Sequence, residues 1–193
     1  RIFTYFSVHL CKIKYDVIGI ENLVSGSAII ASNHQSMWET VVFAKIFPQH
    51  VWILKRELLK VPFFGWTIAT LSPIAIDRSQ GSAAIQQILS QSISRIKNGF
   101  WILAFPEGTR VAPGTKKPYK IGVARMASAL KLPIIPVAHN AGYALPKGSR
   151  LFYPGKVTVI IDKPIYPKDD ESPEDLILKI EDTITKNLAT ITR

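Results

Sequence analysis

Short apolar runs and longer helical repeats follow one another along the chain. Seven short runs are typical of strands: 16–20, 28–32, 51–54, 73–76, 100–105, 133–138 and 157–161. Four stretches instead space their apolar residues as helices do: one that ends near 47, then 82–97, 122–131 and 172–188. Strands that alternate with helices predict an α/β fold, with a mostly parallel or mixed central sheet flanked by helices. We expect residues 1–193 to form a single domain.

Local signals support several of these boundaries. Ser172 followed by Pro173 and two acidic residues is typical of a helix N-terminus. Pro106 removes a backbone donor where the buried run 100–105 ends, so a loop is expected next. Functional groups in such sheets gather in loops beyond the carboxyl ends of strands. Two polar motifs stand in such loops, NHQSMWET at 33–40 and FPEGTR at 105–110.

The first motif has two interpretations. Ser36 and Glu39 fit the S-x-x-E capping box, in which Ser36 caps a helix and Glu39 reaches back to the Ser36 amide. His34 would then lie in the loop before the helix, with Glu39 in its first turn. There the carboxylate could orient His34 as a general base, and it could serve as a cap at the same time.

The second motif combines a carboxylate, a glycine, a hydroxyl and a guanidinium group. This set suits a phosphorylated, hydroxyl-bearing small molecule, because Arg110 can bind phosphate bidentately while Glu107 and the Gly108 region hold polar groups. The alternative is an ordinary turn with a surface ion pair between Glu107 and Arg110.

The charge balance indicates an anionic partner. The chain has 24 Lys and Arg against 14 Asp and Glu, a net charge of +10, which suits nucleic acid, a phospholipid surface, an acidic protein or a phosphorylated metabolite. The sequence contains no recognisable DNA-binding helix pair, zinc finger, basic zipper or aromatic RNA-binding signature, so nucleic acid is disfavoured.

Residues 61–76 carry no charged side chain. Two prolines and a glycine interrupt this segment, and it is shorter than a membrane-spanning helix. The basic residues around it suit contact with an anionic bilayer face; they are Lys55, Arg56, Lys60 and Arg78. A core loop followed by a strand explains the same pattern equally well.

The single cysteine and the first residue bear on two further features, disulfide or zinc sites and a segment upstream of the chain. Cys11 is alone, which excludes an intrachain disulfide and a zinc site built on paired cysteines. The chain opens at Arg1 without an initiator methionine or the apolar region of a signal peptide. A membrane-anchoring segment upstream of this chain therefore stays an open expectation.

Four ordered blocks carry a resemblance to a known family. They are His34 with a carboxylate five residues on, LKRELLKVPFFGW at 54–66 with IDR at 76–78, FPEGTR at 105–110, and IIPVAHNAG at 134–142. Their order and approximate spacing over residues 15–145 resemble the glycerolipid acyltransferase superfamily, and within it the bacterial 1-acylglycerol-3-phosphate acyltransferases. Four ordered blocks are more specific than either motif alone, so the resemblance favours the functional interpretations.

The resemblance implies an enzyme that transfers a fatty acyl group to the 2-hydroxyl of a lysophosphatidate, giving phosphatidate. It implies that His34 is the general base and that Glu39 orients it. The positions that match acceptor-binding or phosphate-binding residues are Lys55, Arg78, Glu107, Gly108, Thr109 and Arg110. The family usually has aspartate where this chain has Glu39, and the extra methylene must be absorbed by the placement of the helix.

The same resemblance implies the partners. The acyl donor would be acyl-CoA or acyl-acyl-carrier protein, used as a co-substrate, and neither a metal nor another cofactor would be needed. The expected location is the cytoplasmic face of the inner membrane, where the chain would be peripheral or held by an upstream segment.

Two other classes of function compete with this one. The first is a hydrolase with Ser36 or Cys11 as nucleophile, although no G-x-S-x-G motif is present. The second is a noncatalytic lipid-binding module, in which the basic and aromatic region 61–78 docks on membranes. This second class would leave the His34 and EGTR blocks without a role.

Overall fold

The computed structural model describes residues 11–77, 82–149 and 151–191. Its strands are β1 (Ile13–Ile18), β2 (Ile29–Ser32), β3 (His50–Lys55), β4 (Ile74–Ile76), β5 (Trp101–Ala104), β6 (Ile134–His139) and β7 (Gly155–Ile161). Its α-helices are α2 (Trp38–Ile46), α3 (Phe64–Ala69), α4 (Ser82–Lys97), α5 (Gly122–Leu130), α6 (Ala141–Ala144) and α7 (Pro173–Thr190). Two 3-10 turns, η1 (Ile20–Asn22) and η2 (Arg56–Lys60), complete the order.

All seven strands join one sheet in the order β1-β7-β6-β2-β5-β3-β4. The neighbours pair in parallel, except for β6 and β7, which run antiparallel. The predicted single-domain α/β fold with a mixed sheet is therefore confirmed. β2 lies at the centre, and its parallel neighbours β5 and β6 end at the same edge of the sheet as β2 does.

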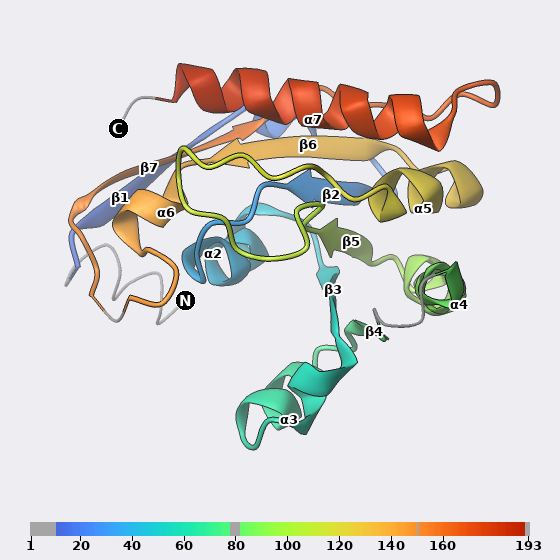
Figure 1. Ribbon diagram of the computed structural model, residues 1–193, viewed down its shortest axis with the longest axis horizontal. Coiled ribbons are helices and arrows are strands. Elements are labelled where there is room, and N and C mark those ends of the chain that lie inside the picture. The colour runs from blue at the N-terminus through green and yellow to red at the C-terminus, as the bar shows by residue number, and fades with distance from the viewer. Residues whose placement is uncertain (1–10, 78–81, 150, 192–193) are drawn as a thin grey trace.

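Helices cover both faces of the sheet (Figure 1). On one face, Ile29 of β2 belongs to a cluster with Val123 of α5 and Ile180 of α7, and α4 packs there as well. On the other face, Ile30 belongs to a second cluster with Phe43 of α2 and Ala141 of α6. Alternate residues of one strand thus enter opposite cores, which explains why Ile29, Ile30 and Ala31 are apolar in succession.

Most predicted boundaries agree with the structure to within a few residues. Ser172 caps α7 as expected, since its Oγ accepts the Asp175 amide at 3.0 Å. The strand expected at 16–20 instead spans Ile13–Ile18, because Gly19 adopts a left-handed conformation (φ 81°) and η1 follows. The helix after the first motif begins at Trp38 rather than directly after Ser36.

The segment 61–76 contains a turn, the short helix α3 and the edge strand β4. Residues of α3 and the turn are largely exposed, whereas Ile74 and Ile76 of β4 are buried. The core-loop interpretation is therefore right for β4 alone. Within the described ranges, no helix has both the length and the apolar character needed to cross a membrane.

Candidate active site

The candidate site lies at the carboxyl edge of the three central strands. NHQSMWET follows β2, FPEGTR extends from the end of β5, and Asn140 follows β6. Because β5, β2 and β6 are parallel neighbours, their ends bring these segments together from distant parts of the sequence.

His34 is fixed through its ring and its main chain. Its Nδ1 lies 2.8 Å from Oε1 of Glu39, and its ring stacks on Phe105 with centroids 3.9 Å apart and planes 13° apart. Its amide donates to Oε2 of Glu107 at 2.8 Å, and its carbonyl accepts the Val111 amide at 2.7 Å. The side chain keeps 19% of its surface exposed, so the orientation is set while one side of the ring stays accessible.

Glu39 acts as both a cap and a partner of His34. Its Oε1 also accepts the amides of Gln35 at 2.9 Å and Ser36 at 2.7 Å. Ser36 in turn accepts the Trp38 amide on Oγ at 3.0 Å. The reach-back bond of the capping box is thus present, and it coexists with the contact to His34.

The carboxyl group of Glu39 is fully buried. Burial acts to raise its pKa, but the neighbouring His139 and His34 and the Ser36 amide together hold that pKa below its ordinary value. Glu39 is therefore ionised at neutral pH. An ionised Oε1 beside Nδ1 makes Nδ1 the protonated nitrogen of a neutral His34 ring, which leaves the lone pair on Nε2.

His139 lies behind this pair, with Nε2 at 3.9 Å from Oε1 of Glu39. Its Nδ1 accepts the Ala141 amide at 3.2 Å and its Nε2 lies 2.8 Å from the Asn33 carbonyl, to which it donates. A ring that accepts on one nitrogen and donates from the other is neutral, and burial accordingly lowers the pKa of His139.

Asn33 and His139 bind one another through two further bonds. The Asn33 side chain donates to the His139 carbonyl at 2.9 Å and accepts the His139 amide at 3.0 Å. The residue before His34 is therefore fastened to the end of β6. Sequence reasoning gave neither residue a role, although both are polar and directly follow or end a buried run.

Gln35 makes a similar connection on the other side of His34. Its Oε1 accepts the Gly142 amide at 3.1 Å. A Cβ at Gly142 would lie 2.7 Å from Cγ of Pro113 and 2.9 Å from Cβ of Gln35. The glycine of IIPVAHNAG is therefore required by close packing against the first motif.

Glu107 holds the main chain of His34 rather than a cation of its own motif. It is buried, and within the described residues no ion pair joins it to Arg110, so the expected alternative of a simple surface pair is not what the structure shows. Burial raises the pKa of Glu107 to about 7, even though the His34 amide favours its ionised form.

This pKa predicts a pH-dependent effect of Glu107→Gln on stability. The folded-state pKa of about 7 lies above the ordinary value of 4.5, so ionisation costs the folded state free energy that grows as pH rises from 4.5 to 7 and then stays constant. Glutamine can still accept the His34 amide without that cost. We expect the variant to be more stable than wild type by on the order of 2 kcal/mol at about pH 8.

Urea unfolding of both proteins at two pH values measures this difference. At about pH 4 the carboxyl is protonated in both folded and unfolded states, so the two free energies of unfolding should converge. A difference that did not change with pH would mean that the ionisation of Glu107 is not coupled to folding.

The remaining predicted residues are more dispersed. Gly108 has φ 72° in the turn closed by its amide on the Phe105 carbonyl, and the Lys120 side chain lies over it. Thr109 is exposed and Arg110 half-buried, while Lys55 is exposed at the end of β3 on the same edge of the sheet. Arg78 lies outside the described residues.

A depression of about 320 Å³ adjoins the site. Gln35 and Glu107 line it together with Lys116 and Lys117 of the loop before α5 and with residues of α6 and α7. Its lining combines polar and apolar side chains and includes residues of both motifs. A ligand held there would meet the exposed Lys116 and Lys117 and the buried Glu107.

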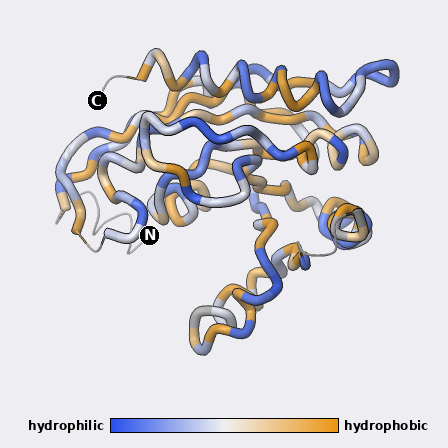
Figure 2. Tube along the Cα trace, in the orientation of Figure 1, coloured by the Kyte–Doolittle hydropathy of each residue, from blue (hydrophilic) through white to orange (hydrophobic). Residues whose placement is uncertain are grey.

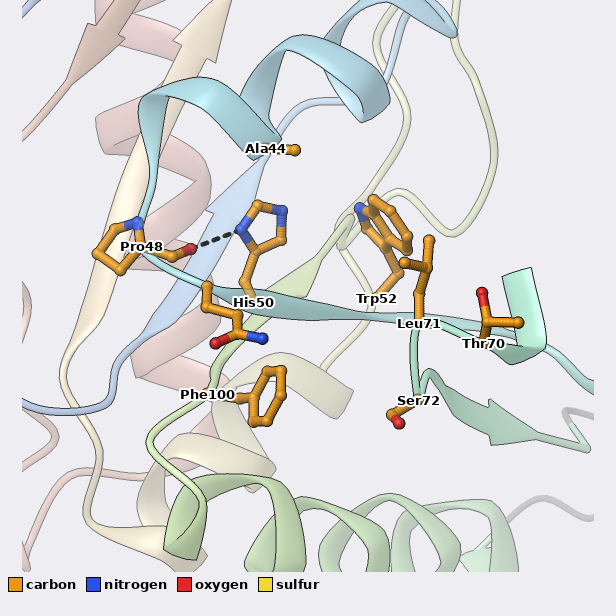
Figure 3. Close-up of a pocket in the computed structure, with 9 residues that line it drawn as sticks. Ala44, Pro48, His50, Trp52, Thr70, Leu71, Ser72 and Phe100 are labelled. Carbon is orange, nitrogen blue, oxygen red and sulfur yellow. Dashed lines mark hydrogen bonds between the residues drawn. The ribbon is translucent and has the colours of Figure 1, made fainter. Parts of the chain in front are cut away.

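A second depression, of about 250 Å³, belongs to the opposite edge (Figure 3). It is lined by His50 at the start of β3 and by Pro48, whose carbonyl accepts from His50 Nδ1 at 2.9 Å. Trp52 and Leu71 form further parts of its wall. Because β3 begins there and ends at Lys55, this depression is separate from the candidate site.

The geometry disfavours the hydrolase alternative. Ser36 is fully buried and its Oγ is engaged by the Trp38 amide, so it is not presented for attack. Cys11 lies against the hydrophobic cluster on the α2 face, before β1. Within the described ranges, no group of three His, Cys, Asp or Glu residues is placed to hold a metal ion.

Comparison with known families gives a match over most of the chain. The family model described as Acyltransferase matches residues 14–140. A 1-acyl-sn-glycerol-3-phosphate acyltransferase of Pseudomonas aeruginosa is 44% identical over 161 residues, which are 83% of this chain and 62% of that protein. One from Saccharomyces cerevisiae is 32% identical over 171 residues, covering 86% and 56%. The chain thus spans less than two thirds of the length of these relatives.

A solved structure supports the same grouping. The crystal structure of the 1-acyl-sn-glycerophosphate (LPA) acyltransferase, PlsC, from Thermotoga maritima matches with a TM-score of 0.77 at 29% identity. The match covers 91% of this chain and 71% of that one. The two folds therefore agree over most of this chain.

Proposed function

Since the chain belongs to the acyltransferase family, we propose that it transfers a fatty acyl group to the 2-hydroxyl of a lysophosphatidate, giving phosphatidate. The donor is an acyl thioester, either acyl-CoA or acyl-acyl-carrier protein. The observation that carries the proposal is the His34 Nδ1 contact to Glu39 at 2.8 Å, which leaves Nε2 of a partly exposed ring for a substrate.

The chemistry follows from this arrangement. Nε2 of His34 takes the proton of the acceptor hydroxyl while the oxygen attacks the thioester carbonyl, so a C–O bond forms. The tetrahedral intermediate then expels the thiolate as the C–S bond breaks, and the imidazolium returns the proton to the sulfur. The ionised Glu39 stabilises the imidazolium between these steps, and the Phe105 stack keeps its plane fixed.

The acceptor and donor both carry phosphate, which suits the basic chain. We assign the acceptor phosphate to the basic side chains Lys55, Arg78 and Arg110, which come from the matching family blocks. Gly108 and Thr109 contribute a turn with accessible polar groups. Glu107 holds His34 in position, because its carboxyl group accepts the His34 amide.

The substrates are amphiphiles, so the acyl transfer takes place at a membrane surface. We propose an anionic surface at the cytoplasmic face of the inner membrane, in keeping with the net charge of +10. The carrier protein, if it is the donor, would meet the same positive field.

The test is an assay for product with purified protein. Acyl-CoA and acyl-acyl-carrier protein are supplied in turn with lysophosphatidate, and phosphatidate is detected by mass spectrometry. Lysophosphatidylcholine and glycerol 3-phosphate serve as alternative acceptors. Phosphatidate formed with either donor supports the proposal, whereas product only from another acceptor would replace lysophosphatidate as the substrate. Vesicle binding without turnover of any pair would favour a noncatalytic lipid-binding module.

A further inference from the structure

One part of the chain extends away from the layered body (Figure 1). It comprises residues 56–71, from η2 through a turn to α3, and we call it the projection. It leaves the sheet at the end of β3 and returns through β4, an edge strand of three residues. Figure 2 shows both hydrophobic and hydrophilic stretches along it.

The projection has a defined shape. A Cβ at Gly65 would overlap the Leu59 carbonyl, so α3 packs directly on the main chain of η2. The Phe63 carbonyl accepts from both the amide (3.0 Å) and the hydroxyl (2.8 Å) of Thr67. The exposed side chains are therefore carried on an ordered support.

Its surface is apolar to an unusual degree. Large hydrophobic side chains with exposed fractions from 39% to 78% are Leu58, Val61, Phe63, Trp66 and Leu71. Phe63 and Trp66 contact each other edge to face, with centroids 5.2 Å apart. Phe63 also has φ 60°, a backbone conformation that costs an aromatic residue free energy.

Basic residues border this apolar surface. Lys55 at the end of β3 and Arg56 and Lys60 of η2 are exposed, against the single acidic residue Glu57 in the same stretch. Exposed aromatic side chains with exposed cations in the same segment match a bilayer whose acyl region is bordered by lipid phosphates. A soluble acidic protein would match the cations but would leave exposed rings without an apolar partner.

We propose that the projection inserts Phe63 and Trp66 into an anionic lipid bilayer, with its basic residues at the level of the phosphates. The role of this insertion rests on the proposed function, since the proposed substrates are lipids. β3 runs parallel to β5, and the projection leaves the sheet at the same edge that carries His34. Insertion therefore directs the candidate site toward the membrane.

The first experiment measures partition of the purified chain onto equimolar phosphatidylglycerol and phosphatidylcholine vesicles by co-sedimentation. Replacing Phe63 and Trp66 together with serine should lower the partition coefficient roughly tenfold or more. The matched control, Tyr166→Ser with Leu178→Ser, removes two side chains of 59% and 63% exposure elsewhere and should leave it unchanged. Equal losses in both variants, or no binding by wild type, would overturn the proposal.

Tryptophan fluorescence tests the depth directly, because Trp66 is the most exposed of the four tryptophans. Brominated lipids should quench the wild-type emission, and Trp66→Phe should abolish the quenching while binding continues. Quenching that persists in Trp66→Phe would place the contact elsewhere on the chain.

Turnover separates this inference from the proposed function. The Phe63 and Trp66 serine variant should retain its rate with lysophosphatidate in detergent micelles and lose it with lysophosphatidate in vesicles. Lipid quenching of Trp66 in a protein that turns over no substrate would leave the insertion intact and reject the enzyme activity. Loss of the micellar rate as well would reject a role limited to membrane insertion.

Discussion

His34→Ala is expected to lower the rate constant for acyl transfer by about 10²- to 10⁴-fold, the contribution of a positioned general base. The ring supplies Nε2, and it is held by Glu39 at Nδ1 and by stacking on Phe105. The fold should survive, because the bonds to Glu107 and Val111 are made by the main chain of residue 34. Initial rates of phosphatidate formation and a thermal melt measure the two effects.

His50→Ala is the matched control for this prediction. His50 is also a partly buried histidine, but it lies at the amino end of β3, away from the candidate site. Its loss should leave the rate close to that of wild type. A His34→Ala protein that kept the wild-type rate would exclude His34 as the base.

Substitutions of Glu39 should separate charge from hydrogen bonding. Glutamine can still accept the amides of Gln35 and Ser36 on its oxygen, so Glu39→Gln should fold normally but lose the negative charge that supports the imidazolium. We expect its rate to fall by up to the roughly 10²- to 10⁴-fold of the base itself. Initial rates compared with those of His34→Ala measure how much of the base function depends on that charge.

Glu39→Ala should also destabilise the fold. It leaves two buried amides without an acceptor, and each such loss costs about 1–3 kcal/mol. Urea unfolding of the glutamine and alanine variants measures this contrast. Equal stabilities would contradict the capping role of Glu39, and a wild-type rate in Glu39→Gln would contradict its electrostatic role.

Glu39→Asp addresses the departure from the usual family aspartate. The first turn of α2 is fixed by the buried side chains of Trp38, Val42 and Phe43, so the backbone resists moving toward His34. Aspartate at this position should therefore reach Nδ1 less well, and its rate should lie between those of wild type and Glu39→Gln.

Much of this architecture follows from local sequence patterns. The apolar runs that became β2 and β5 are buried at every residue, and Ser172 with Pro173 marked the start of α7 correctly. The first strand was placed too late because the pattern 16–20 ignores the positive φ of Gly19, which ends β1. The antiparallel pairing of β7 with β6 depends on the whole topology rather than on its own residues.

The candidate site was less predictable than the fold. The contact of His34 with Glu39 joins residues five positions apart, so the motif alone could predict it. The Asn33 bonds to His139 join residues 106 positions apart, and the Glu107 contact to His34 spans 73. Such partners are set by strand order, which no local pattern contains. Glu107 was expected to bind substrate, yet its position also gives it a supporting role.

The central place of β2 has a consequence for how the chain matures. β2 is made early, but the strands on both sides of it, β5 and β6, leave the ribosome much later. Until then, its four consecutive residues, which are fully buried in the finished protein, have no partner strands. The nascent chain therefore carries an unpaired apolar strand until β5 has been made, a state that favours both aggregation and chaperone binding. His34 and Glu39 are present throughout this period, but Glu107 and His139, which contact them in the finished protein, are made only with the later strands.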